Sequence, residues 1–293
     1  MKSLIFRLLE NSLGGSSNRN ISLKNIHKSD SCLLLGTGVS IDEIELRKIK
    51  NIKIFGCNLI YYLKDFNSIN LDFYAAINHF LAYDPVSQKK MYKDLFQANQ
   101  NSNTKFFIRS LNKLIIPRSS LPKDSIYYVK GGKSKDGLNN IYDKNINYCD
   151  ISKSVFLFSN VFEFMIAACL YLGFKKIYLA GFGYTYYPKL HYHFYDEFDD
   201  FDLNLPWEKP IFNINDKATQ EKFALDRGFK IFKRIKLNDS EVCRFIDYKQ
   251  DDLSRHKLIN SIASANNAKI YNIVPDGLES PIYPKISKHA LYE

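Results

Sequence analysis

The chain has 293 residues, 45% of them hydrophobic, with 22 Phe and 20 Tyr, so it is long and apolar enough to bury a large core. This composition excludes a disordered chain, and no apolar stretch reaches the roughly 18 residues that cross a bilayer. The five Cys are odd in number and none is spaced as a metal-ligand pair, which argues against a disulfide framework and a zinc site. We expect reduced, mostly buried thiols. The net charge of +10 favours an anionic partner without choosing among nucleotide, acidic glycan, nucleic acid and membrane; a basic protein that is merely soluble is the alternative.

Residues 1–30 form a separate N-terminal extension. Within it, Leu4, Leu8 and Leu9 fall near one helical face, and Lys2 and Arg7 lie off that face. Such a segment either packs against the domain or lies on an anionic membrane surface. Residues 14–18, Gly-Gly-Ser-Ser-Asn, read as a flexible joint. The extension lacks the apolar block and cleavage site of a signal peptide, so we expect a cytoplasmic protein.

Short apolar, β-rich runs alternate with helical patterns along the rest of the chain. The predicted strands are residues 32–36, 52–57, 71–75, 104–109, 126–130, 155–158, 176–181 and 269–274. The clearest helix covers residues 161–172 and is followed by Gly173. Glycine favours the left-handed backbone conformation that commonly ends an α-helix. This alternation predicts an α/β fold with a doubly wound, mostly parallel Rossmann-like sheet. We expect residues 31–182 and 251–293 to form this domain.

Residues 183–250 interrupt the alternation. Aromatic, acidic and proline residues dominate as far as Trp207, and an irregular helical stretch follows. We interpret the interruption as an inserted lid or acceptor subdomain, because segments that close over a substrate are commonly inserted between core elements. A purely structural excursion that covers a sheet edge is the alternative.

The most informative motif is residues 33–40, Leu-Leu-Leu-Gly-Thr-Gly-Val-Ser, in which an apolar strand runs into a glycine turn. Gly36 and Gly38 permit close approach of the backbone, and we expect a helix to begin at Ser40. The first turn of a helix offers unpaired N–H donors and the positive end of the dipole. Ser40 and Glu43 match a capping box. These features predict a nucleotide site at this turn; a glycine turn that only redirects the chain is the alternative.

Three motifs then occur in an order found in a known enzyme family. They are Gly36-Thr-Gly-Val-Ser40, Gly56-Cys-Asn58, and Ser159-Asn-Val161 before the helix and strand that end in Leu172-Gly173 and Leu179-Ala-Gly181. In these motifs the chain resembles the bacterial sialyltransferases of glycosyltransferase family 42, over residues 31–181 and again at residues 270–275.

The resemblance implies a GT-A-like variant of the Rossmann-like sheet. It also implies a metal-independent, inverting transfer of a sialic-acid-like nonulosonic sugar. The donor would be a CMP-activated sugar, which is a substrate and no cofactor, and the acceptor an oligosaccharide or glycolipid of a bacterial surface. Peripheral contact with the inner membrane and homo-oligomerisation are left open.

The resemblance also implies a set of nucleotide-contacting residues. Carried over by position, the set is Gly36, Thr37, Gly38, Ser40, Asn58, Ser159 and Asn160. Three positions depart from the family pattern: Thr37 stands for an Asn, Gly56 for an Arg, and Asn160 for a Gly. Asn58 matches the family's Asn at the end of the second strand; a strand-end turn residue is the alternative reading.

Two tyrosine hydroxyls touch the departing phosphate in this family. Here the resemblance implies Tyr186 and Tyr192, with Tyr184 and Tyr187 as neighbours that can serve instead. Phenol donors suit this task because they stabilise negative charge on a leaving phosphate without a cation.

A histidine is the natural base for the acceptor hydroxyl. The family's position for it falls near Gln250, which cannot accept the proton. His191 and His193 are therefore the leading candidates, and His256 is the third.

No metal site is predicted. Asp200-Phe-Asp202 has the Asp-x-Asp form that holds Mn²⁺ or Mg²⁺ in other glycosyltransferases, but a solvated face of the insertion is the favoured interpretation. A CMP donor carries a single phosphate and has less need of a metal.

Two other functions are weighed against the transferase. One is a nucleotide-dependent enzyme related to flagellin-glycosylation and pterin diphosphokinase-like proteins, whose ATP-dependent form would need Mg²⁺. The other is a basic nucleic-acid-binding module, which ranks last because the aromatic residues alternate into predicted strands and the insertion. No nucleic-acid partner is therefore expected.

Overall fold

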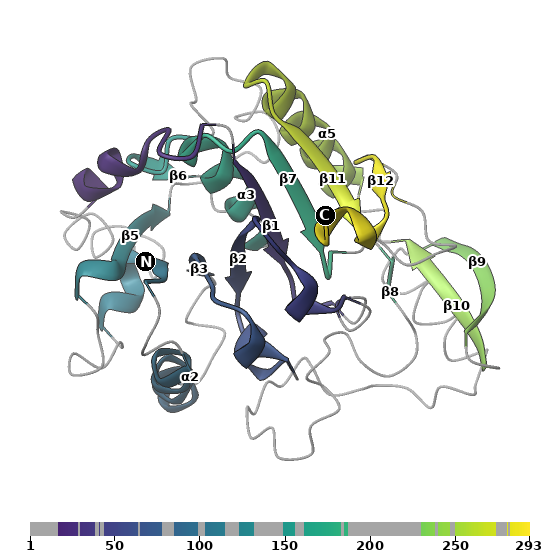
Figure 1. Ribbon diagram of the computed structural model, residues 1–293, viewed down its shortest axis with the longest axis horizontal. Coiled ribbons are helices and arrows are strands. Elements are labelled where there is room, and N and C mark those ends of the chain that lie inside the picture. The colour runs from purple at the N-terminus through teal and green to yellow at the C-terminus, as the bar shows by residue number, and fades with distance from the viewer. Residues whose placement is uncertain are drawn as a thin grey trace, which may run out of the picture.

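A parallel sheet of nine strands forms the centre of the molecule, in the order β12-β11-β7-β1-β2-β3-β4-β5-β6 (Figure 1). The computed structural model describes residues 17–28, 30–38, 41, 44–63, 65–77, 85–98, 103–114, 123–131, 149–155, 161–182, 185–186, 230–237, 240–246, 250–273, 280 and 282–293. Every pairing within this sheet is parallel.

Seven of the eight predicted strands are confirmed with ends that shift by at most two residues; the strand predicted at residues 155–158 is confirmed at Val155 alone, because residues 156–158 lie outside the described part of the chain. The sheet strands are β1 (Ser31–Leu35), β2 (Lys53–Cys57), β3 (Phe73–Ala76), β4 (Lys105–Arg109), β5 (Ile126–Gly131), β6 (Ser154–Val155), β7 (Lys176–Ala180), β11 (Lys269–Ile273) and β12 (Lys285–Ile286). Strand β12, at the sheet edge, was not predicted, because a two-residue strand leaves no periodic pattern.

In the described part of the chain, three α-helices accompany the strands. They are α2 (Pro85–Ala98), α3 (Val161–Leu172) and α5 (Gln250–Ala265). The short 3₁₀ helices are η1 (Ser17–Leu23), η3 (Leu46–Lys48), η4 (Ile60–Tyr62), η5 (Phe66–Ser68), η7 (Ser110–Leu114), η9 (Lys123–Ser125) and η12 (Lys288–Leu291).

Successive side chains of β1 enter two different hydrophobic cores, one on each face of the sheet. Cys32 and Leu34 belong to the core that contains α3 and part of α5. Leu33 and Leu35 belong to the core that contains α2 residues such as Tyr92. Figure 1 shows α3 and α5 on one side of the strands and α2 on the other. Burial of both faces explains the nearly continuous apolar strands, and the predicted doubly wound α/β fold is confirmed.

Helix α3 has the predicted bounds, and all of its residues are buried. It ends at Gly173, whose φ of +98° lies in the left-handed region that glycine adopts without strain. The N–H groups of Gly173 and Phe174 both donate to the carbonyl of Cys169, at 3.0 and 3.1 Å. The predicted helix stop is therefore confirmed.

The described part of the N-terminal extension packs against the domain. The Asn20 side chain on η1 is fully buried, and its amide donates to the carbonyls of Tyr128 (3.0 Å) and Ile151 (2.8 Å). The His27 ring stacks on Phe174 with centroids 4.7 Å apart. Residues 17 and 18 belong to η1, so the joint predicted at residues 14–18 is wrong for these two. Residues 1–16, with the apolar helical face, lie outside the described part.

A second, antiparallel sheet has the order β8-β10-β9 and lies between β7 and β11 in the chain; it is made of β8 (Thr185–Tyr186), β9 (Lys230–Leu237) and β10 (Ser240–Ile246). The helical stretch predicted before residue 250 is therefore wrong for residues 230–246. The strand register places Glu241 opposite Lys236 and Val242 opposite Ile235. Such pairing depends on residues of both strands, which a helical reading of one segment misses.

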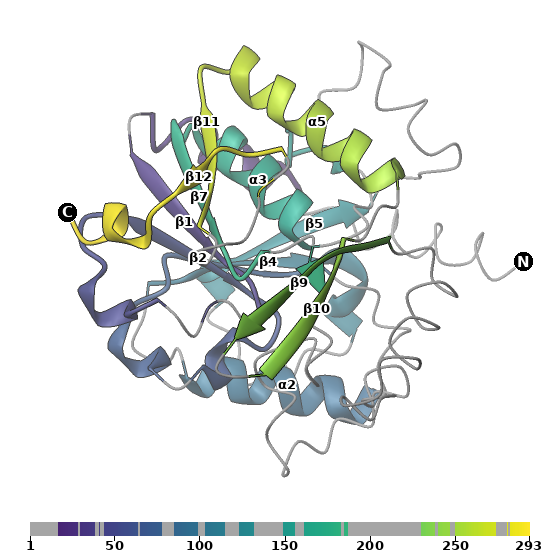
Figure 2. The same cartoon turned by 90° about the vertical axis from the view of Figure 1, so that its right-hand side faces the viewer.

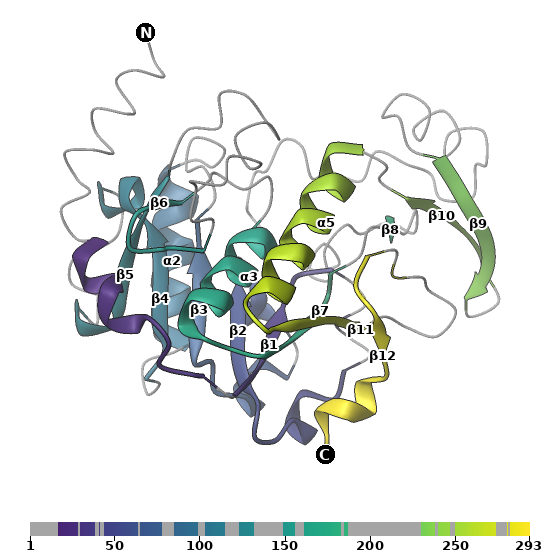
Figure 3. The same cartoon turned by 90° about the horizontal axis from the view of Figure 1, so that it is seen from above.

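This small sheet lies on the side of the molecule toward which β7 and β11 point (Figures 1 and 3). Seen from that side, β9 and β10 stand in front of the main sheet (Figure 2). The chain connectivity agrees, because β8 follows β7 directly.

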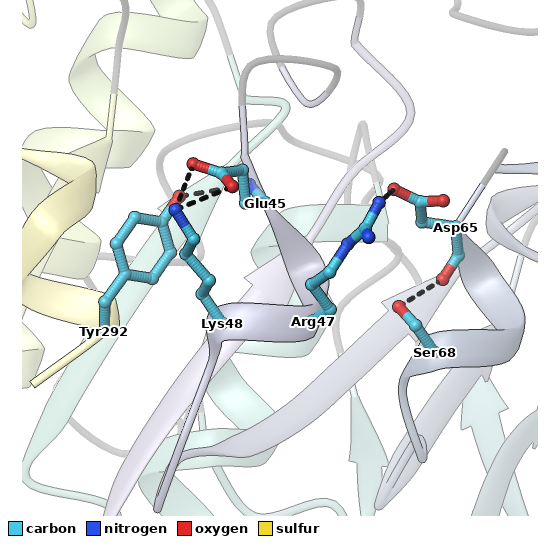
Figure 4. Close-up of polar contacts among 6 residues, drawn as sticks. All are labelled: Glu45, Arg47, Lys48, Asp65, Ser68 and Tyr292. Carbon is cyan, nitrogen blue, oxygen red and sulfur yellow. Dashed lines mark hydrogen bonds and ion pairs between the residues drawn. The ribbon is translucent and has the colours of Figure 1, made fainter.

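A polar cluster fastens the C-terminus to the connection between β1 and β2 (Figure 4). The Glu45 N–H donates to the Tyr292 hydroxyl at 3.0 Å, and Lys48 Nζ lies 2.8 Å from a Glu45 carboxylate oxygen. Arg47 reaches the Asp65 carboxylate at 3.5 Å. The hydrogen bond from Lys48 lowers the pKa of Glu45. The cluster is exposed, so its ion pairs add little stability. Their main effect is to hold the C-terminal residues beside the connection between β1 and β2.

Four of the five Cys are described as free and buried: Cys32, Cys57, Cys149 and Cys169. The expectation of reduced, mostly buried thiols is confirmed for these four. Burial raises the pKa of the Cys149 thiol to about 12, which keeps it protonated and unreactive.

Candidate functional site at the carboxyl edge of the sheet

The strand order reverses between β1 and β7. The chain runs outward from β1 through β2 to β6, returns to β7 on the other side of β1, and continues to β11 and β12. Gly36 follows the carboxyl end of β1, and Gly181 follows that of β7. Open α/β sheets bind ligands at the carboxyl edge where the order reverses. The glycine motif therefore stands at the position where a ligand is expected.

Gly36, Gly38 and Gly181 allow the segments that follow β1 and β7 to pass close to each other. The Gly36 N–H donates to the Ala180 carbonyl at 2.8 Å, and the Gly38 N–H donates to the Gly181 carbonyl at 3.1 Å. A Cβ on Gly38 would lie 2.6 Å from the same Gly181 oxygen, and Gly181 itself has a φ of +65°. Both glycine N–H groups therefore donate within the protein, and an anion at this turn would need other donors.

The α-helix predicted to begin at Ser40 does not continue along the described residues. The N–H of Ile41 donates to Gly38 and that of Ile44 to Ile41, which are single turns of 3₁₀ type. Glu45 then has a ψ of 86°, which is not helical. Ile41, Ile44 and Leu46 are all buried, at a spacing that no single helical face provides. Ser40 itself lies outside the described residues, which contain no continuing α-helix whose dipole could attract a phosphate at this turn.

Asn58 follows β2, directly beside the glycine turn. Strand β2 is the neighbour of β1, with Gly56 paired to Leu35, and the Cys57 thiol lies 3.5 Å from the Leu35 carbonyl oxygen. Asn58 has a φ of +50°, a left-handed conformation that Asn tolerates better than most residues. Its N–H donates to the Ala75 carbonyl at 3.3 Å. Thr37 is buried in the adjacent turn.

A buried charged cluster lies at the same edge, and His256, the third candidate base, is its one member that was predicted from the sequence. The Glu163 carboxylate, 1% exposed in the first turn of α3, accepts from Arg255 Nε at 3.2 Å. His256, also 1% exposed, places Nε2 3.7 Å from this carboxylate and Nδ1 2.8 Å from the Tyr283 hydroxyl. The sequence signal is Glu163 itself, the one charged residue in the otherwise apolar run 161–172.

The cluster has a defined protonation pattern. Burial, aided by Arg255, lowers the pKa of His256 to about 3. Burial and Glu163 raise the pKa of Tyr283 well above its ordinary value. Both groups are therefore neutral near pH 7. A neutral imidazole that accepts from the Tyr283 hydroxyl at Nδ1 carries its proton on Nε2, which faces the carboxylate.

Phe182 joins this cluster to the start of the insertion. Its ring centroid lies 5.2 Å from that of His256 and 4.8 Å from that of Phe162. Phe182 leads from β7 into residues 183–250, and His256 lies on the helix that leaves them. The two ends of the insertion therefore pack on each other and on α3.

Of the remaining predicted site residues, the structure describes Tyr186. Tyr186 belongs to β8 and pairs with Phe245 of β10. The others lie outside the described residues: Ser159, Asn160, His191, Tyr192 and His193. Among the described residues there is no group of His, Cys, Asp and Glu that could hold a metal ion, and Asp200 and Asp202 fall outside this range. Within the same range, no helix is long and apolar enough to span a bilayer.

Comparison with known proteins gives matches in structure only. No family model matches the sequence, and no curated protein matches it. The fold is similar to that of the sialyltransferase CstII from Campylobacter jejuni in complex with CMP-3FNeuAc, at 15% identity over 87% of this chain and 86% of that chain, with a TM-score of 0.40. It is similar to the monofunctional alpha-2,3-sialyltransferase Cst-I from Campylobacter jejuni, at 18% identity over 89% and 82%, with a TM-score of 0.41.

A third match is the MAf glycosyltransferase from Magnetospirillum magneticum AMB-1, at 13% identity and a TM-score of 0.43. It covers 96% of this chain and 39% of that chain. Identities and TM-scores in this range describe a general likeness in chain path.

Proposed function

We propose that this chain is a glycosyltransferase that binds a CMP-activated nonulosonic sugar where the residue 36–38 turn meets Asn58. The observation that carries the proposal is the convergence of this turn, Gly181 and Asn58 at the point where the strand order reverses. The order of motifs shared with family 42 sialyltransferases favours CMP as the nucleotide. The net charge of +10 suits an anionic donor.

The donor is held by side chains more than by the glycine backbone. Because the N–H groups of Gly36 and Gly38 donate to Ala180 and Gly181, a phosphate has to find other donors. We assign this role to Thr37, Ser40 and Asn58, together with the pair Ser159 and Asn160 that precedes α3. The glycines then serve to bring these side chains close to the donor.

The proposed reaction is a single inverting displacement. The acceptor hydroxyl attacks the anomeric carbon of the sugar, the bond from that carbon to the phosphate oxygen breaks, and CMP leaves. The hydroxyls of Tyr186 and Tyr192 stabilise the charge that develops on the phosphate. A single phosphate leaving with this support needs no divalent cation, and we propose a metal-independent reaction.

The acceptor proton passes to a histidine. A base has to reach the bound hydroxyl, and both ring nitrogens of His256 face buried protein groups. We therefore propose His191 or His193 as the base and a packing role for His256. Residues 183–250 would form the lid and acceptor subdomain over a nucleotide-sugar domain of residues 31–182 and 251–293. An oligosaccharide or glycolipid acceptor at the inner face of a membrane fits this scheme.

Thermal unfolding with nucleotides tests the proposal. Because a ligand that binds the folded state raises its stability, CMP should raise Tm more than UDP, GDP or ATP, with or without Mg²⁺. Preference for UDP or GDP would overturn the donor assignment. A preference for ATP that needs Mg²⁺ would support the diphosphokinase-like alternative instead.

An activity assay tests the reaction itself. The protein is incubated with CMP-sialic, CMP-legionaminic, CMP-pseudaminic and CMP-Kdo donors in EDTA, and release of CMP is measured. Transfer or slow hydrolysis of one donor is expected. If no donor releases CMP, with or without Mg²⁺, the proposed activity is wrong.

A further inference from the structure

We infer that Tyr74 is a positioning residue for nucleotide binding, which acts by holding the peptide of Asn58. The inference rests on the proposed function, because it assigns the residue that orients one of the proposed donor contacts. It concerns β3, a strand that contributes no predicted site residue.

Tyr74 lies on the strand next to Asn58. In the β2–β3 register Tyr74 pairs with Gly56. Its side chain is fully buried, and its ring centroid lies 6.0 Å from that of Phe106. Its hydroxyl donates to the carbonyl oxygen of Asn58. A buried phenol hydroxyl needs a hydrogen-bond partner. Here the partner is the peptide that ends β2.

Both peptide groups of Asn58 are thus held by β3. Its carbonyl accepts from Tyr74, and its N–H donates to Ala75 at 3.3 Å. These two bonds hold Asn58 at a φ of +50°, which an Asn adopts only where its surroundings favour it. Once φ is fixed, the direction of the Cα–Cβ bond is fixed as well. The Tyr74 hydroxyl therefore sets the direction in which the Asn58 side chain leaves the strand end.

The Tyr74 ring and the Tyr74 hydroxyl have separate roles, and Tyr74→Phe removes only the second. Tyr74 keeps its ring in the core if only the hydroxyl is removed, so Tyr74→Phe leaves the apolar contacts unchanged. The Asn58 carbonyl belongs to a half-buried residue that water can reach. Loss of the hydroxyl is therefore expected to loosen Asn58 more than the core.

A double-mutant cycle separates the two roles. The variants are Tyr74→Phe, Asn58→Gly and the double variant, and the measurement is the Kd for CMP by calorimetry. Glycine at position 58 keeps the left-handed backbone and removes the side chain. Tyr74→Phe is expected to raise the Kd roughly fivefold, the worth of one hydrogen bond. In the Asn58→Gly background it should have no further effect, because residues that act through one another are not additive.

Tyr92→Phe is the matched control. Tyr92 is also fully buried in the same core, and its hydroxyl accepts from the Asn112 amide at 2.7 Å, away from Asn58. This variant should lower Tm and leave the Kd for CMP unchanged.

Each other outcome overturns the inference in a recognisable way. Equal effects of Tyr74→Phe with and without the Asn58 side chain would show that Tyr74 acts elsewhere. An unchanged Kd, or a Tyr74→Phe protein that does not fold by circular dichroism, would show a role in stability alone. If the wild-type protein does not bind CMP, the proposed function fails first and the inference falls with it.

Discussion

Arg255 Nε donates to the Glu163 carboxylate at 3.2 Å, and this pair joins α3 to α5 across 92 positions of sequence. Glu163 is 1% exposed, whereas the Arg255 side chain reaches solvent in part. The carboxylate is therefore removed from water and depends on its protein partners. Because α5 lies between β10 and β11, this pair fixes the helix through which the chain returns to the parallel sheet.

Glu163→Gln should destabilise the protein by about 1–3 kcal/mol, because it removes the charge from a buried hydrogen-bonded pair. Glu163→Ala should cost more, since it also leaves a cavity beside Arg255. Denaturant unfolding measures both. Glu45→Gln, in the exposed pair with Lys48, is the control and should leave the midpoint unchanged. Equal effects at the two sites would contradict the importance of burial.

Stability should fall in acid because of His256. Its pKa is about 3 in the folded protein and about 6.5 when unfolded, so the unfolded chain takes up a proton that the folded one refuses. The contribution of the neutral His256 ring to folding stability is fully present above pH 6.5 and is lost as the pH falls toward 3. Between pH 7 and 4.5 the loss is on the order of 2–3 kcal/mol. The Glu163 carboxylate opposes this shift, and Arg255 reinforces it.

Chemical unfolding of wild type and His256→Gln between pH 7 and 4.5 checks this dependence. The variant should show a shallower decline, because it lacks the group that titrates only when unfolded. His289→Gln, at an exposed position, should follow the wild-type curve. Parallel curves for wild type and His256→Gln would contradict the assignment.

Gly36→Ala should destabilise the protein by about 1–3 kcal/mol, because overpacking forces neighbours to move. The new Cβ would lie 2.1 Å from a ring carbon of Phe162 and 2.6 Å from the Gly181 carbonyl oxygen. The second contact is backbone and cannot rotate away. Thermal unfolding is the measurement.

Gly56→Ala provides the comparison, since its Cβ would lie 2.9 Å from the branch methyl of Ile60 and 3.1 and 3.2 Å from the Leu71 methyls. These contacts are longer and involve side chains alone, so this variant should lose less stability than Gly36→Ala. A larger loss at Gly56 would argue against the close crossing at Gly36.

Asn20→Asp should be strongly destabilising, by about 3 kcal/mol or more, because it places a buried carboxylate against two carbonyl oxygens. Those oxygens belong to Tyr128 and Ile151. Unfolding midpoints and the rate of tryptic cleavage at Lys24 both report the loss. Ser22→Ala, exposed on the same short helix, should change neither. Unchanged cleavage in Asn20→Asp would show that η1 is held by other contacts.

Local pattern was sufficient for much of the fold. The apolar runs of the parallel strands, buried on both faces, and the fully apolar helix before Gly173 predicted the sheet and α3 almost to the residue. The same reasoning failed after Gly38 and at residues 230–246. In the first case Ile41, Ile44 and Leu46 are buried at a spacing that does not follow one helical face, and in the second, the segments pair as antiparallel strands.

Residue types and their spacing along the chain were enough to predict the α/β class, the strand positions and the glycine turn, because each depends on neighbours in sequence. The partners were decided by tertiary structure. The Gly36 and Gly38 N–H groups donate to the carbonyls of Ala180 and Gly181. The Asn58 carbonyl accepts from the Tyr74 hydroxyl. The Glu163 carboxylate lies beside Arg255 and His256. Such contacts join segments far apart in the chain, and only the packing of the whole sheet brings them within hydrogen-bond distance.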